Sequence, residues 1–383
     1  MLEAPSDLVS RDLPSSCEVE SPPVTTLDKD ALPNCIAHCS LSDFPSIAST
    51  DRTFRSLIKD KDLYRLRRAK AKGIVEHWIY FTGREMEWEA YDPNGDRWLR
   101  VPKMTLNECF MCSDKESLSV GTELLMFGKQ MNTPRSNVIY KYSVLTHAWT
   151  SGKQMNTPRC LFGSASLGEV AVVAGGCEYD RCGKILNSAE IYSLESGEWT
   201  AITSMNKARK MCSSVFMDGS FYVIGGIGEG SSKMLMCGEV YDLKKKTWTL
   251  IPNMLQQGSN GGGDQAKEVS SGSGARPVVA VVKDELYAAD YAQQEVRKYD
   301  KRRNVWNKVG NLPERDSWMN GWGMAFRACG DKLVVVGIGP RGVGRRTIEI
   351  NACVPREGKS LHWRVLASKP SESFVYNCVV MGC

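Results

Sequence analysis

Short apolar segments separated by polar turns make up most of this chain. Residues 170–174 (VAVVA) and 221–224 (FYVI) are two such segments, and a pair of glycines follows each. No apolar spacing typical of an amphipathic helix lies between the segments. Apolar runs of about four to eight residues bounded by turns indicate β-strands. We therefore expect an all-β structure from residue 73 to the end of the chain.

A fixed aromatic spacing divides this region into repeats. Tryptophans at 98, 149, 199, 248, 306 and 363 follow one another at steps of 51, 50, 49, 58 and 57 residues. Except for Trp363, each has a tyrosine seven positions earlier. A unit of this size with four short strands cannot bury both faces of its sheet alone. We therefore expect the units to stack against one another.

Glycine pairs and large aromatic residues have distinct roles in such a unit. Glycine lets two backbones approach where a side chain would collide. Tyrosine and tryptophan bury a large apolar area and keep one polar atom for a hydrogen bond, which suits packing between sheets. The predicted structural residues of the repeat are Gly175, Gly176, Gly225, Gly226, Tyr142, Trp149, Tyr192, Trp199, Tyr241, Trp248, Tyr299 and Trp306.

The pattern of two glycines, a tyrosine, six residues and a tryptophan resembles the kelch repeat. The resemblance implies a β-propeller, a ring of four-stranded sheets called blades. The region opens at residues 74–81, which match a second strand, and closes at residues 374–381, which match a first strand. We therefore predict an all-β propeller of six blades, in which the C-terminal strand completes the opening blade and removes an exposed sheet edge.

Four arginines lie near the predicted connections between strands. Arg159, Arg209 and Arg315 follow the repeat tryptophans at similar distances. Arg135 ends an octapeptide, GKQMNTPR, that recurs at residues 152–159. The second copy is in register with the repeat, and nothing in the pattern explains the first. Because loops on a rigid scaffold carry most binding, the four arginines are candidate contacts to a target. Packing or support of turns is an equally open role.

Residues 30–72 have a different periodicity. Apolar side chains at positions 32, 35, 36 and 39 fall on one face of a helix. Ser42 is a candidate N-cap for the next helix, with Pro45 in its first turn. Further apolar stripes follow at positions 44, 47, 48 and at 54, 57, 58. We expect three or four short helices, too small a unit to fold well without a partner or a docked neighbour.

This segment, LPNCIAHCSLSDFPSIASTDRTFRSLIKDKDLYRLRR, resembles the F-box in its opening Leu-Pro, its helical stripes and its Phe-Arg-Ser-Leu-Ile. With the kelch region it makes the chain similar to plant F-box/kelch-repeat proteins. The resemblance implies that the helices bind a Skp-type adaptor of a cullin–RING ubiquitin ligase and that the propeller selects the target protein. Carried over by position, the adaptor face comprises Leu32, Pro33, Ile36, Phe44, Ile47, Phe54, Leu57 and Ile58, unless these residues form only the core of the helical unit.

Charge divides the chain in the same places. Against an overall formal charge of +5, residues 1–30 hold seven acidic and two basic residues, and residues 31–72 hold nine basic and four acidic residues. An acidic segment rich in proline and serine cannot bury enough apolar surface to offset its ordering entropy. We therefore expect a disordered acidic tail (1–29), an F-box-like helical module (30–72) and a kelch propeller (73–383). Basic clusters such as residues 65–72 are expected to be solvated.

Other functional classes find little support. The chain has no apolar run long enough for a membrane span and no apolar core of a signal peptide near its start. Its 14 cysteines in 383 residues indicate reduced thiols and a cytoplasmic or nuclear protein. The four histidines are scattered, and the pairs Cys109/Cys112 and Cys177/Cys182 lack a second pair for a metal. We expect no metal, cofactor, nucleic acid or membrane partner. A scaffold independent of ubiquitin ligases is the alternative, and a propeller enzyme the third.

Overall fold

The computed structural model describes residues 31–69, 75–83, 87–104, 110–130, 137–178, 183–230, 234–255, 277–315, 323–340, 346–371 and 374–382. The predicted acidic tail and Arg135 lie outside these ranges. Within them, four short helices precede six four-stranded sheets. The predicted class, a six-bladed kelch-type β-propeller behind a small helical module, is confirmed.

Four α-helices and one 3-10 turn form the helical module. The helices are α1 (Ala31–Ala37), α2 (Phe44–Thr50), α3 (Arg52–Ile58) and α4 (Lys61–Arg68), and the 3-10 turn is η2 (Leu41–Asp43). Asp51 and Asp60 cap α3 and α4, each accepting a hydrogen bond from the backbone N–H two residues later. The predicted N-cap at Ser42 was wrong by one residue, because Asp43 is the N-cap of α2, the helix with Pro45 in its first turn. Ser42 lies within η2, which is capped by Ser40, and the Ser40 side chain accepts from the Ser42 N–H.

Apart from β24, the strands of the first three blades lie between the helical module and residue 202. Blade 1 contains β24 (Asn377–Gly382), β1 (His77–Thr82), β2 (Trp88–Asp92) and β3 (Arg97–Arg100). Blade 2 contains β4 (Phe110–Val120), β5 (Glu123–Gln130), β6 (Asn137–Ser143) and β7 (Ala148–Ser151). Blade 3 contains β8 (Gly163–Leu167), β9 (Val170–Ala174), β10 (Ala189–Ser193) and β11 (Glu198–Ile202).

The other three blades complete the ring, with the first strand of each blade next to the first strands of its neighbours. Blade 4 contains β12 (Ser213–Met217), β13 (Ser220–Ile224), β14 (Gly238–Asp242) and β15 (Thr247–Ile251). Blade 5 contains β16 (Val278–Val282), β17 (Glu285–Asp290), β18 (Glu295–Asp300) and β19 (Val305–Asn311). Blade 6 contains β20 (Ala325–Cys329), β21 (Lys332–Ile338), β22 (Thr347–Cys353) and β23 (Arg364–Pro370).

The seven-residue spacing of tyrosine and tryptophan has a direct structural cause. In blades 1 to 5 the two residues lie opposite each other on the third and fourth strands of one sheet. Their ring centroids are 5.0 to 5.5 Å apart. From blade 2 to blade 6 the tryptophan Nε1–H also donates, at 2.7 to 3.0 Å, to a carbonyl at the end of the preceding blade. The repeat therefore marks how each sheet attaches to the one before it.

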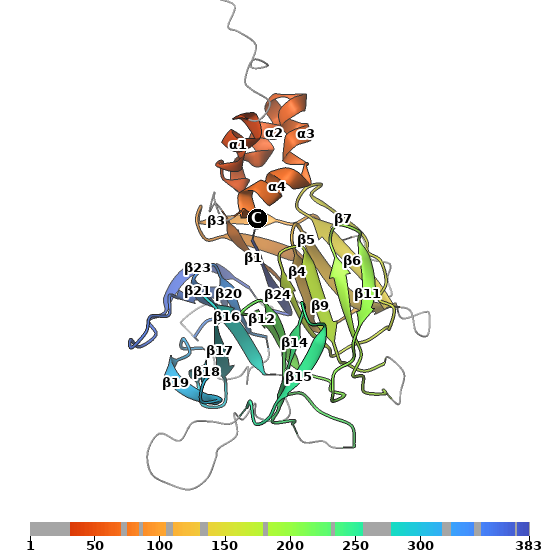
Figure 1. Ribbon diagram of the computed structural model, residues 1–383. Helices are drawn as coiled ribbons and strands as arrows, with labels where there is room; N and C mark the ends of the chain where they lie inside the picture. Colours follow the sequence, from red (N-terminus) through yellow and green to blue (C-terminus); the bar gives the residue numbers. More distant parts are fainter. Residues whose placement is uncertain are drawn as a thin grey trace, which may run out of the picture.

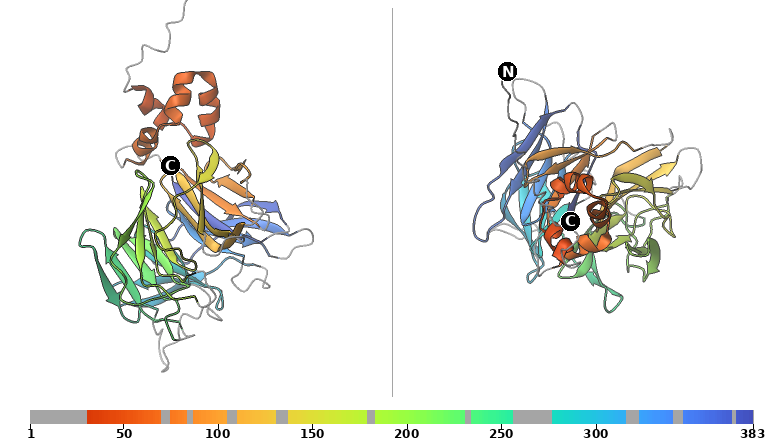
Figure 2. Two further views of the ribbon diagram at one scale, coloured as in Figure 1. Left: turned by 90° about the vertical axis from the view of Figure 1, so that its right-hand side faces the viewer. Right: turned by 90° about the horizontal axis from the view of Figure 1, so that it is seen from above.

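The module lies over one face of the ring (Figure 1). Seen from above, its helices lie over the middle of the ring, beside the C-terminus (Figure 2). This face carries the turns that join first to second strands and third to fourth strands, because Glu169 and Val144 lie in such turns and contact the module. Since the strands are antiparallel, the connections from second to third strands and from blade to blade lie on the opposite face, which we call the loop face.

The predicted ring closure is confirmed by the pairing of β24 with β1 over six residue pairs, from His77 and Gly382 to Thr82 and Asn377. Deleting residues 374–383 would remove this inner strand together with Val375, Cys378, Val379 and Met381, which are buried. Each such side chain contributes about 1.5–3 kcal/mol, so the loss is comparable with the whole stability of a typical domain, about 5–15 kcal/mol.

We expect the protein truncated after Ser373 to aggregate or to melt far below the full chain in differential scanning calorimetry. Removal of Cys383 alone is the control and should leave the melting temperature unchanged. A truncated protein that stays monomeric and keeps its melting temperature would contradict closure of the ring by β24.

The glycine pairs allow the close backbone approach that their sequence predicts. Gly176 has a φ of +92°, and a Cβ there would lie 2.5 Å from the carbonyl oxygen of Cys160. Gly219, in the turn between β12 and β13, has a φ of +71° and nothing within 4 Å of such a Cβ. Both glycines therefore have a left-handed backbone conformation, and only at Gly176 would a side chain also collide with a neighbouring backbone.

Alanine substitution should separate these two effects. Gly219→Ala should lower the free energy of unfolding by about 1–2 kcal/mol, the cost of a left-handed non-glycine residue. Gly176→Ala should lower it clearly further, because the backbone around Cys160 must also move. Urea denaturation of both variants measures the difference, and equal losses would show that the close approach is unimportant.

Candidate interaction sites

The eight predicted adaptor-face residues divide into two groups. Ile36, Phe44 and Ile58 are only 4%, 4% and 8% exposed and pack together with Leu63 and Tyr64. These three side chains form the core of the module and do not present a contact surface. The partly exposed members are Leu32, Pro33, Ile47, Phe54 and Leu57. They come from α1, α2 and α3, whereas α4 supplies the arginines that contact the ring.

A buried arginine ties the module to the start of the ring. The guanidinium of Arg67 is fully buried, lies 5.3 Å from the centre of the Phe44 ring and donates to the carbonyls of Ala37 and Cys39. It also pairs with Glu76 at 3.6 Å. Glu76, just before β1, accepts from the Leu41 N–H at 3.0 Å. The expectation of a solvated basic cluster was therefore wrong for this residue.

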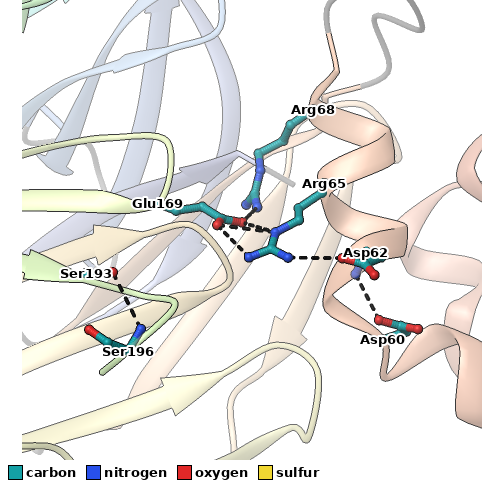
Figure 3. A network of polar contacts seen from close by, with 7 residues as sticks. All are labelled: Asp60, Asp62, Arg65, Arg68, Glu169, Ser193 and Ser196. Atoms are coloured by element: carbon teal, nitrogen blue, oxygen red, sulfur yellow. Dashed lines mark hydrogen bonds and ion pairs between the residues drawn. The ribbon is translucent and has the colours of Figure 1, made fainter. Parts of the chain in front are cut away.

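A second contact joins α4 to blade 3 (Figure 3). Arg65 donates from Nε and Nη2 to the carboxylate of Glu169 at 3.0 Å each, and Arg68 donates from Nη2 to the same group at 2.8 Å. The hydrogen bonds from Arg65 hold the pKa of Glu169 below its usual value. Together with Val144 and Leu145, which pack against the module, these residues form what we call the module–ring junction.

Two of the arginines predicted as target contacts, Arg159 and Arg209, are buried. Arg159 pairs with Glu190 at 2.8 Å, and Arg209 pairs with Glu239 at 2.6 Å. Both guanidinium groups are 0% exposed, so neither arginine offers a surface to a target. Burial lowers the pKa of Arg159, and Glu190 opposes that shift.

These pairs connect the glycine pairs to the loop face. Nη1 of Arg159 donates to the carbonyl of Gly175 at 3.1 Å and of Ser188 at 2.7 Å. Glu190 in turn accepts from the backbone N–H groups of Asn156 and Thr157 at 2.8 and 2.9 Å. Blade 4 repeats the arrangement with Arg209, Gly225, Cys237, Glu239, Asn206 and Lys207. The ion pair therefore fixes the connection that leads into blade 3 and the one that leads into blade 4.

The sequence carried a signal for the acidic partners that was missed. Glu190 and Glu239 each stand two residues before a repeat tyrosine, Tyr192 and Tyr241. Arg315 differs from the other two arginines because it is half-buried and donates to the carbonyls of Gly337, Val335 and Glu349. Burial lowers its pKa to about 10.

The described part of the chain offers few candidate residues for metal binding or thiol chemistry. No group of three or more His, Cys, Asp and Glu side chains there could hold a metal ion. Cys160 and Cys177 have their Sγ atoms 3.6 Å apart, while Cys109 and Cys182 lie outside the described residues. None of the helices in the described ranges is long and apolar enough to span a membrane.

Comparison with known proteins places this architecture in a family. The family model described as the Kelch motif matches residues 158–206 and 208–255, which contain blades 3 and 4. The chain is 72% identical over 368 residues to the F-box/kelch-repeat protein At1g74510 of Arabidopsis thaliana, covering 95% of this chain and 80% of the relative. It is 53% identical over 360 residues to the F-box/kelch-repeat protein SKIP11 of the same plant, covering 94% and 75%.

A helical module joined to a ring of kelch-type blades is the architecture that the resemblance implied. The chain belongs to the F-box/kelch-repeat proteins.

The buried ion pair of blade 3 gives a stability prediction. Glu190→Ala leaves the charge of Arg159 buried without its partner, and breaking a buried pair in this way costs about 3–5 kcal/mol. Glu195→Ala, in an exposed turn of the same blade, is the control and should change stability by less than about 0.5 kcal/mol. Urea denaturation monitored by tryptophan fluorescence measures both, and equal stability of the two variants would contradict this role for the pair.

Proposed function

We propose that this protein is a substrate receptor of a Skp–cullin–F-box type ubiquitin ligase. The observation that carries the proposal is the division of the molecule into two opposed surfaces. Partly exposed apolar side chains of α1 to α3 lie on the module, and the loop face lies on the other side of the ring (Figure 1). One surface suits an adaptor and the other suits a target.

The adaptor surface would consist of Leu32, Pro33, Ile47, Phe54 and Leu57. Buried apolar anchors carry most of the binding energy in protein interfaces, and these side chains are partly exposed next to a packed core. The core residues Ile36, Phe44 and Ile58 would support that surface from below. Their role is then to hold the helices in place, not to touch the adaptor.

The target surface would be the loop face. Connections held by the Arg159–Glu190 and Arg209–Glu239 pairs are rigid at their base and present exposed side chains such as Lys184, Lys207 and Glu229. Loops on a rigid scaffold are the usual place for recognition. The chain itself would perform no bond chemistry. It would raise the rate of ubiquitin transfer by holding target lysines near an enzyme supplied by its partners, a proximity effect, in the cytoplasm or nucleus.

The second candidate function is a kelch scaffold that works without a ubiquitin ligase. The same ring and loop face would serve such a scaffold equally well. The two functions differ in whether the helical module binds a Skp-type adaptor.

Binding of a purified Skp-type adaptor to the full chain distinguishes them. We expect Leu32→Ala/Pro33→Ala to weaken binding at least about tenfold, as loss of about 1.4 kcal/mol of interface energy would. Leu250→Ala, an equally apolar change on an exposed outer strand of the ring, is the matched control and should bind normally. Isothermal titration calorimetry measures the affinities, and circular dichroism verifies that the variants are folded. Undiminished binding of the double variant would refute the assigned surface, and no binding by the unaltered chain would favour the scaffold.

A further inference from the structure

We propose that Glu169 and its partners Arg65 and Arg68 are positioning residues that hold the module at a fixed angle over the ring. This inference rests on the proposed function, because a fixed angle sets where a bound target stands relative to the ligase. None of the residues in this contact belongs to either proposed binding surface. Its role would therefore be to fix the orientation of one binding surface relative to the other.

The bonding pattern favours one orientation. Arg65 directs two parallel N–H groups at the Glu169 carboxylate, and Arg68 adds a third bond from the next turn of α4. Paired arginine–carboxylate bonds of this kind impose geometric specificity as well as attraction. A further bond of 3.1 Å from Arg65 Nη1 to Asp62 holds the guanidinium in place from within α4 (Figure 3).

Glu169 stands on a rigid base. It lies in the tight turn between β8 and β9, where its own carbonyl accepts from the Leu194 N–H at 2.9 Å. The preceding carbonyl, of Gly168, accepts from the Gly121 N–H of blade 2 at 2.9 Å. The carboxylate therefore projects from a turn that is tied to its own blade and to the neighbouring one.

Two separate attachments are needed to define an angle, since a module held at one point could swivel. The first is Glu169 on blade 3. The second lies on blade 1, where Glu76 accepts from Leu41 and pairs with the buried Arg67, and Arg97 donates to Ser42 at 3.3 Å. Val144 and Leu145 of blade 2 pack between them. The module thus spans three blades and covers the middle of this face (Figure 2).

Exposed ion pairs contribute little to global stability, and Arg65 is 41% exposed. The inference therefore predicts a specific signature. Reversing the charge of Glu169 should change the orientation of the module far more than it changes the melting temperature of the ring. A residue that only stabilised the turn would show the opposite behaviour.

The test is a distance measurement on the full chain. Because the chain has 14 cysteines, spin labels are attached to genetically encoded amino acids at Ser49 on α2 and Lys244 on blade 4, both exposed. We expect one narrow distance distribution by double electron–electron resonance for the unaltered protein. Glu169→Arg should lose this narrow peak, and the swapped variant Arg65→Glu/Arg68→Glu/Glu169→Arg should regain it. Asp331→Arg, in the equivalent turn of blade 6, is the matched control and should keep it.

The outcomes separate this inference from the proposed function. A narrow peak retained by Glu169→Arg, or not regained by a folded swapped variant, would overturn the positioning role. If the swapped variant does not fold, Glu169→Gln decides: it should broaden the distribution, and an unchanged distribution would overturn the inference. Adaptor affinity is measured in parallel and should be the same for Glu169→Arg and the unaltered chain. Absence of adaptor binding would refute the proposed function and leave the distance result intact.

Discussion

Six sheets form a ring without a free end because β24, from the last residues of the chain, pairs with β1, the first strand after the helical module. A single four-stranded sheet has two faces and cannot bury both, so every blade depends on its neighbours for its core. The hydrogen bonds from Trp149, Trp199, Trp248, Trp306 and Trp363 to the preceding blades follow the same direction around the ring. Closure also brings the C-terminus beneath the module (Figure 2), so the ends of the propeller meet where the helices attach.

Charge is used in two physically different ways in this molecule. Inside blades 3 and 4, the Arg–Glu pairs are fully buried, so removal of either partner leaves an uncompensated charge. Several hydrogen bonds from each pair also hold the connection that leads into its blade. At the module–ring junction the pairs of Arg65 and Arg68 with Glu169 are partly exposed, and their directional bonds matter more than their energy. The buried pairs thus act on the loop face, and the junction acts on the module at the opposite face of the ring.

The pattern of apolar segments and aromatic residues was sufficient to predict stacked four-stranded units, because it follows from local spacing repeated many times. The resemblance of that pattern to the kelch repeat implied the propeller, and a count of the strands then gave six blades and the closure. The candidate site was harder to predict. Ile36, Phe44 and Ile58 lie in the same predicted helical stripes as the partly exposed Leu32, Ile47 and Leu57, respectively. Only the packing of all four helices decides which of these side chains are enclosed. Arg159 and Arg209 were predicted as possible contacts to a target because they stand next to loops. Their burial depends on Glu190 and Glu239, which are about thirty residues away in sequence.

The octapeptide GKQMNTPR occurs twice in the chain, and comparison of the two copies separates the effect of sequence from the effect of tertiary structure. In the first copy, Gly128 and Lys129 of β5 pair with β6, and Gln130 of β5 pairs with β4. In the second copy, residues 152–159 form the connection into blade 3. The segment Gly-Lys-Gln is thus part of a strand in the first copy and of a connection in the second, so identical residues take different structures. In the second copy the carboxylate of Glu190 satisfies the backbone N–H groups of Asn156 and Thr157 in place of a neighbouring strand. The sequence by itself determined the class of fold and the family. The neighbours that the ring brings together decided which arginines are buried and where the module docks.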